Sequence, residues 1–188
     1  MNILFVTGCN SPFFNSLLVC LQSFAERLPG HRLLVCDFGL TSAQANFLRG
    51  LGLWLAQPPN LERRGVFDCK AALISYLRHG GHKVENYDAM VWLDADLTLM
   101  DVGIGDFEAV ISAVKSTGVP VAICPEPAGR TIAQMISLFA DASAIAPFAR
   151  TVADTGIDTG APYLSTGLFF CGSAALFGLL GGTDALGR

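Results

Sequence analysis

Charged residues are scarce in this sequence. Lys, Arg, Asp and Glu make up 15% of the 188 residues, while hydrophobic residues make up 52%. An average globular chain is less apolar and more charged. The net charge of −4 lacks the basic excess of a general nucleic-acid binder, so we expect no nucleic-acid partner. A small anionic ligand stays compatible with this charge, because a few local cations suffice to bind one.

Long apolar runs and cysteine motifs are also missing. No run approaches the ~20 apolar residues of a membrane-spanning helix, so we expect no transmembrane segment. The start, MNILFVTG, lacks the basic region and the longer apolar stretch of a signal peptide. The six cysteines form no Cys-x-x-Cys pair, and their spacings suit neither a zinc site nor a disulfide framework. We therefore expect a cytoplasmic protein with free, buried thiols.

Short apolar runs alternate with amphipathic stretches along the chain, and its length favours one domain with a substantial core. We expect strands at 2–7, 32–39, 51–56, 89–94, 119–124 and 164–171. Helices are expected after caps at Ser11, Thr41, Asp68 and Thr131, from Asp106 onwards, and over 173–180, while 141–165 shows no clear pattern. This alternation predicts an α/β fold with a mostly parallel sheet and helices on both faces.

Polar residues follow several of the expected strands, where open parallel sheets bind ligands. Asp94 and Asp96 come after the run AMVWL, and 7–11 and Asp37 lie at the ends of two other expected strands. A simple turn would explain two aspartates, because aspartate suits turn geometry. However, two carboxylates in apolar surroundings repel each other and lose hydration. A divalent cation such as Mg²⁺ or Mn²⁺ offsets both costs.

The stretch VWLDAD (91–96) resembles the D-x-D motif of nucleotide-sugar glycosyltransferases with the GT-A fold. Three more stretches are similar to segments of such families: CDFGLTSAQANFL (36–48), FDCKAALISYL (67–77) and YLSTGLFFC (163–171). The resemblance implies one GT-A-like domain. It also implies an enzyme, hexosyltransferase-like, that moves a sugar from a nucleoside-diphosphate sugar to an acceptor. UDP is the expected nucleotide, and the unknown acceptor is a glycan, a lipid or a protein.

The resemblance also assigns roles to residues. It implies that Asp96 ligates the Mn²⁺ or Mg²⁺ that binds the diphosphate, while Asp94 contacts the sugar or ribose, or the metal through water. Thr7, Asn10 and Ser11 would face the nucleotide. Asp37 is expected to contact the base or ribose.

Two further contacts with the nucleotide sugar are expected at Lys70 and Gly167. Lys70 lies in the first turn of an expected helix, where the helix dipole disfavours a cation by ~0.3–1 kcal/mol. Lys70 therefore either contacts an anion such as the diphosphate or is simply solvated. The same two interpretations apply to Arg63 and Arg64. Before Gly167 the family usually has Asn, whereas this chain has Ser165 and Thr166.

The sequence departs from the family in the positions of its histidines. Many retaining members use a histidine far downstream as a third metal ligand, but here every histidine precedes Asp94. Members also usually exceed 188 residues, so we interpret the chain as a minimal member or one shortened at its C-terminus. An inverting enzyme needs a carboxylate base, for which Glu126 and Asp158 are candidates by position.

Two alternatives remain. LDADLTLMD also resembles the first motif of haloacid-dehalogenase-type phosphatases, in which Asp94 would be the nucleophile, Asp96 the acid/base and Thr98 an orienting residue, with Mg²⁺. That motif normally lies on the first strand of its fold, whereas about three β-α units precede it here. The other alternative is a non-catalytic nucleotide-sugar-binding domain that keeps Asp96 and Lys70. The sequence does not indicate which oligomeric state the protein adopts.

Overall fold

The computed structural model describes residues 1–59, 72–118, 121–125, 128–138 and 145–172. They contain a six-stranded sheet with the strand order β3-β2-β1-β4-β6-β5. The strands are β1 (Ile3–Cys9), β2 (Leu33–Asp37), β3 (Trp54–Leu55), β4 (Ala89–Leu93), β5 (Val121–Pro125) and β6 (Leu164–Gly172). All six strands were expected from the sequence, although β3 is shorter than the run over 51–56.

The sheet is mostly parallel, as the sequence predicts. β1 pairs in parallel with β2 and with β4, and β2 pairs in parallel with β3. β6 instead runs antiparallel to β4, with Leu93 opposite Leu168 and Ala89 opposite Gly172. The alternation of strands and helices does not reveal this direction, because an apolar strand can pair either way. The carboxyl ends of β1, β2 and β4 consequently lie at one edge of the sheet.

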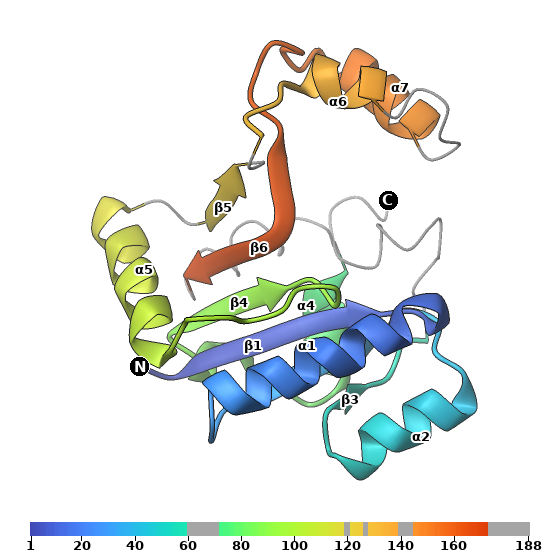
Figure 1. The fold of residues 1–188 in the computed structure, drawn as a ribbon, viewed down its shortest axis with the longest axis vertical. Helices are drawn as coiled ribbons and strands as arrows, with labels where there is room; N and C mark the ends of the chain where they lie inside the picture. The colour runs from blue at the N-terminus through green and yellow to red at the C-terminus, as the bar shows by residue number, and fades with distance from the viewer. Residues whose placement is uncertain (60–71, 119–120, 126–127, 139–144, 173–188) are drawn as a thin grey trace. The chain divides into compact units, whose positions relative to one another are not determined.

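Helices cover both faces of the sheet (Figure 1). On one face, α1 (Phe14–Arg27) and α5 (Ile104–Thr117) bury Phe24 and Phe107 against Phe5 of β1. On the other face, α4 (Leu73–His79) packs against the neighbouring residues of β1 and β4. α2 (Ser42–Gly50) joins the α1 side through Leu48. β1, β2 and β4 therefore form a buried middle layer, and their residues are mostly apolar on both sides.

Local capping signals set most of the helix starts. Thr41 accepts a hydrogen bond from the Gln44 amide at 3.3 Å, and the Gln44 side chain accepts one from the Thr41 amide at 2.9 Å. Thr131 and Gln134 repeat this capping box before α6 (Ile132–Leu138). Both caps confirm the expectation from sequence. The helix α7 (Ile145–Thr155) has no counterpart among the expected elements.

Two expected helix starts are wrong in detail. The first helical turn is a 3₁₀ turn over Ser11–Phe13, and Asn10 caps it by accepting a hydrogen bond from the Phe13 amide at 3.4 Å. Ser11 is thus inside the turn, because the neighbouring asparagine competes for the cap position. α5 begins at Ile104, and Asp106 reaches back to the Gly103 amide at 2.8 Å. The expected cap Asp68 and the helix over 173–180 lie outside the described residues.

The chain divides into two compact units, residues 1–122 with 167–188 and residues 123–166. The first unit contains β1 to β4 and the helices around them. In the second, Thr131 forms an antiparallel bridge with Pro162, and the Tyr163 amide donates to the Arg130 carbonyl at 2.8 Å. Among the described residues, no helix combines the length and apolar character needed to cross a bilayer.

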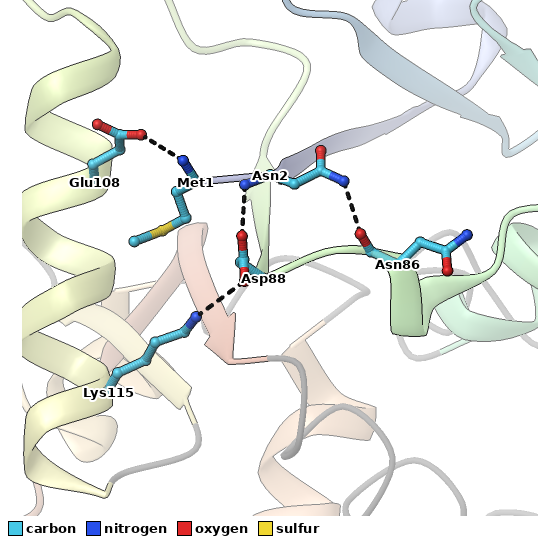
Figure 2. A network of polar contacts seen from close by, with 6 residues as sticks. All are labelled: Met1, Asn2, Asn86, Asp88, Glu108 and Lys115. Carbon is cyan, nitrogen blue, oxygen red and sulfur yellow. Dashed lines mark hydrogen bonds and ion pairs between the residues drawn. The ribbon is translucent and has the colours of Figure 1, made fainter.

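A polar network joins β1, β4 and α5 at the amino end of the sheet (Figure 2). The Met1 amino group lies 3.2 Å from the Glu108 carboxylate, and the Asn2 amide donates to Asp88 at 2.7 Å. Lys115 lies 3.9 Å from the same aspartate. The hydrogen bond from Asn2 and the charge of Lys115 lower the pKa of Asp88. These charges pair with one another at the opposite end of the sheet from Asp94 and Asp96.

Candidate functional site

The loops that follow β1 and β2 are bonded to each other at the carboxyl edge of the sheet. The Phe38 amide donates to the Cys9 carbonyl at 2.9 Å, and the Ser11 amide donates to the Gly39 carbonyl at 3.0 Å. The Gln44 side chain adds a hydrogen bond to the Ser11 carbonyl at 3.3 Å. Gly8 gives the Phe38 ring its space, because an added Cβ would overlap that ring. Of the residues predicted to face the nucleotide, Ser11 and its neighbour Asn10 lie in this fixed turn.

Asp37 at the end of β2 accepts several hydrogen bonds from its own chain. Its Oδ1 accepts from the amides of Gly39 at 2.9 Å and Leu40 at 2.8 Å, and its Oδ2 accepts from the Trp54 indole at 3.2 Å. The Tyr76 hydroxyl also donates to its main-chain carbonyl at 2.7 Å. The predicted contact with the base or ribose stays a prediction, but this carboxylate already organises the loop after β2.

Asp94 directly follows β4 and is held from two sides. Its amide donates to the Gly167 carbonyl in β6 at 2.7 Å, and its Oδ1 accepts a hydrogen bond from the Trp92 indole at 2.6 Å. Trp92 and Asp94 lie two residues apart, so their side chains point to the same face of the sheet. The half-buried carboxylate therefore has a fixed orientation, and Gly167 serves the site through its backbone.

Asp96 sits differently, in the turn that follows. Its side chain is exposed, and among the described residues no hydrogen bond or ion pair reaches its carboxylate. The turn itself is fixed, because the Leu97 amide donates to the Asp94 carbonyl at 3.1 Å and Ala95 is buried. An open carboxylate thus projects from a rigid backbone.

α1 anchors this turn through residues that sequence reasoning missed. The buried Ser23 hydroxyl accepts from the Leu99 amide at 3.1 Å and donates to the Cys20 carbonyl at 2.9 Å. The Cys20 thiol lies 3.9 Å from the Asp94 carbonyl. A serine in the apolar stripe of an expected helix was the only sequence signal for this contact.

Burial and the nearby aspartates both disfavour the thiolate forms of Cys9 and Cys20. Burial, and then the charges of Asp96 and Asp94, raise the pKa of Cys20 to about 11. Burial, with smaller effects from Asp37 and Cys20, raises the pKa of Cys9 to about 12. Both thiols stay protonated at neutral pH, and thiols are nucleophiles or metal ligands only as thiolates. Among the described residues, Cys9, Cys20, Cys36, Cys124 and Cys171 form no disulfide bond, and all but the half-buried Cys124 are buried.

Thr7 is the predicted nucleotide contact that lies deepest. Its side chain is 0% exposed in the central strand β1, beside Val35 of β2. Its hydroxyl has no hydrogen-bond partner within the part of the chain that the structure describes. Thr7 therefore lies inside the sheet and has no solvent-accessible surface.

Several predicted residues fall outside the described residues, namely Lys70, Arg63, Arg64 and Glu126. Asp158 is described in the second unit, where it is exposed and accepts a hydrogen bond from the Gly160 amide at 2.9 Å. This hydrogen bond gives Asp158 a turn-forming role within its own unit. The proposals for a phosphate-binding lysine and for a general base thus stay predictions.

The donor set at this edge fits a hard divalent cation. Across the described ranges, no three His, Cys, Asp or Glu side chains gather closely enough to hold a metal ion. Two carboxylates alone suit Mg²⁺ or Mn²⁺, which usually take one or two carboxylates and fill the other positions with phosphate oxygens and water. Asp96 has the exposure and the unshared oxygens for such a ligand, and Asp94 lies two residues away in the same turn.

The arrangement of strands and helices is the GT-A fold of glycosyltransferases. An active-site mutant of LgtC matches with a TM-score of 0.51 at 16% identity over 93% of this chain and 58% of that one. The galactosyltransferase LgtC with donor and acceptor sugar analogs matches with a TM-score of 0.50 at 15% identity, over 93% and 59%. Mouse xyloside xylosyltransferase 1 matches with a TM-score of 0.54 at 12% identity, over 95% and 70%.

These likenesses establish the fold and leave the activity to be argued from the site. This chain spans less than two thirds of the length of the LgtC structures. No protein-family model matches it, and no curated protein matches it.

Proposed function

We propose that this chain is the donor-binding part, or all, of a metal-dependent glycosyltransferase that takes a nucleoside-diphosphate sugar as its donor. One observation carries the proposal: Asp96 presents an open carboxylate beside the oriented Asp94 at the carboxyl edge of a GT-A sheet. This edge is where open α/β sheets bind their ligands. The names of the similar structures, which are galactosyl- and xylosyltransferases, agree with this donor class.

Each residue of the site has a proposed task. Asp96 would ligate Mn²⁺ or Mg²⁺, and such a cation, when bound, stabilises the negative charge that develops on the leaving diphosphate. Asp94 would contact the ribose or the sugar from its fixed position. The turn of Asn10 and Ser11 would line the nucleotide, and Lys70 would add a second positive charge near the phosphates.

The finer assignments are also proposals. UDP is the first nucleotide to test, a hexose is the first sugar, and the acceptor is a glycan, a lipid or a protein. Glu126 or Asp158 would serve as the base if the enzyme inverts the anomeric centre. A cytoplasmic location remains a prediction.

The fold weighs against the phosphatase alternative. The aspartates follow β4, and three strands with their helices precede β4 in the chain. In haloacid-dehalogenase-type phosphatases the corresponding motif lies on the first strand. A non-catalytic nucleotide-sugar binder would keep the same site, so only a chemical measurement separates it from an enzyme.

Calorimetric titration tests the proposal. A panel of nucleoside diphosphates and their sugars would be titrated with and without Mn²⁺ into the wild type and into Asp96→Ala. We expect one nucleotide to bind only with Mn²⁺, and Asp96→Ala to abolish this binding. Slow hydrolysis of the bound nucleotide sugar would then distinguish an enzyme from a binder. Failure of folded wild type to bind any nucleotide in the panel would contradict the proposal.

A further inference from the structure

Trp92 is a buried side chain with a polar group that must find a partner. It is 1% exposed in the central strand β4. Its indole N–H can only donate a hydrogen bond, and a buried donor without an acceptor is costly. The acceptor is Oδ1 of Asp94, at 2.6 Å. The buried Trp92 is thus connected directly to the candidate site through its hydrogen bond to Asp94.

Two aromatic rings fix the plane of this indole. Phe38, just after β2, stacks on it with ring centroids 6.1 Å apart and an interplanar angle of 15°. Phe169 of β6 stacks on it at 5.9 Å and 7°. The indole lies between them and belongs to the same buried cluster as Tyr76. Close packing on both sides leaves the N–H only one direction in which to point.

We infer that Trp92 is a positioning residue, whose hydrogen bond holds the Asp94 carboxylate in the orientation that the bound metal–nucleotide complex requires. The inference rests on the proposed function and goes beyond it by adding a residue that itself touches neither metal nor donor. The physical reason is preorganisation: a carboxylate that is free to rotate must be ordered on binding, whereas one held by an indole is already ordered. Partners that orient a binding residue typically affect metal affinity or activity by roughly 10–100-fold.

A purely structural role for Trp92 makes a different prediction. If the hydrogen bond only satisfies the indole, its loss lowers stability and leaves the affinity for nucleotide unchanged. The test must therefore compare metal-dependent affinity with stability in the same variants.

The experiment removes the N–H and keeps the rings. Trp92→Phe deletes the donor, and replacement of Trp92 by 3-benzothienylalanine exchanges the N–H for sulfur at nearly unchanged shape. If Trp92→Phe folds poorly, the benzothienyl variant provides the test instead. Tyr76→Phe, which removes the hydroxyl that donates to the Asp37 carbonyl, is the matched control from the same cluster. UDP with Mn²⁺ would be titrated into each protein by calorimetry, and the melting temperature would be measured in parallel.

We expect both position-92 variants to bind UDP–Mn²⁺ more weakly than wild type, by about tenfold or more. The affinity of Tyr76→Phe should equal that of wild type. In the background of Asp94→Ala, the benzothienyl replacement should cause no further loss, because Trp92 acts through Asp94. Equal affinity of wild type and the position-92 variants, or the same loss in both backgrounds, would overturn the inference and leave the proposed function standing. A wild type that binds no nucleotide would overturn both.

Discussion

Asp37 and Asp96 are both carboxylates near the carboxyl ends of parallel strands, yet the structure uses them in opposite ways. Asp37 accepts hydrogen bonds from two backbone amides and from the Trp54 indole. Asp96 is exposed, and among the described residues nothing donates to its carboxylate. Asp94 lies between these extremes, because an indole orients it at the surface of the site.

The difference teaches that a position at the carboxyl edge of the sheet does not by itself make an aspartate functional. The hydrogen bonds already made within the chain decide what remains for a ligand. By that criterion Asp37 serves the loop after β2, its contact with the base or ribose stays a prediction, and Asp96 is the candidate metal ligand. The predictions that follow test this division.

The largest effect is expected for Asp96→Asn. We expect the hydrolysis or transfer rate of the nucleotide sugar with Mn²⁺ to fall by roughly 100-fold or more, because several kcal/mol of charge stabilisation are lost. The melting temperature should stay unchanged, since the side chain is exposed. Asp101→Asn is the matched control, because Asp101 is an exposed aspartate nearby that pairs with Arg27 at 3.7 Å. Equal rates in both variants would refute the role of Asp96.

Asp37→Ala should show the reverse pattern. We expect the free energy of unfolding to fall by about 2–4 kcal/mol, because two amides and an indole lose a charged acceptor. Urea denaturation followed by circular dichroism measures this loss. A variant of wild-type stability that no longer binds nucleotide would contradict this expectation and support the predicted contact of Asp37 with the base or ribose.

Ser23→Ala should have a moderate effect, on the anchor of the Asp96 turn. The Leu99 amide would lose its acceptor, which costs about 1–2 kcal/mol in the free energy of unfolding. Amide hydrogen exchange over 95–99 should become faster, while exchange over 38–41 stays at the wild-type rate. Uniformly faster exchange in both loops would show that Ser23 does not act locally.

The effect that is smallest at neutral pH concerns the thiol beside Asp37, because it appears only in alkaline solution. The pKa of Cys9 is raised from 9.0 to about 12 in the folded protein. Above pH 9 the unfolded chain loses this proton while the folded chain keeps it, so the stability from Cys9 is present below pH 9 and lost as the pH rises towards 12. We expect the free energy of unfolding between pH 9 and pH 11 to fall more steeply for wild type than for Cys9→Ala. Parallel curves would contradict the raised pKa.

Local patterns in the sequence predicted much of the fold. Apolar runs marked all six strands, and Thr41 and Thr131 marked helix starts because their partners Gln44 and Gln134 lie only three residues away. The antiparallel direction of β6 was missed, since it depends on pairing with β4 more than seventy residues earlier in the chain. α7 was missed because the stretch 141–165 shows no clear pattern in the sequence.

The candidate site was predicted in part. The spacing of Asp94 and Asp96 and their position after β4 were visible in the sequence, and so was the two-residue spacing that places Trp92 beside Asp94. The hydrogen bond from Trp54 to Asp37 was not visible, because this indole lies seventeen residues away. The anchoring of the turn by Ser23 depends on a contact 76 residues apart, which no local pattern reveals.

Mn²⁺ binding most directly tests the division between the open carboxylate of Asp96 and the internally hydrogen-bonded carboxylate of Asp37. Electron paramagnetic resonance would count the bound Mn²⁺ per chain, in the presence of UDP, for wild type, Asp96→Asn and Asp37→Asn. The account predicts one bound ion in wild type and in folded Asp37→Asn, and none in Asp96→Asn. A bound ion in Asp96→Asn at wild-type affinity, or its loss only in Asp37→Asn, would contradict the account.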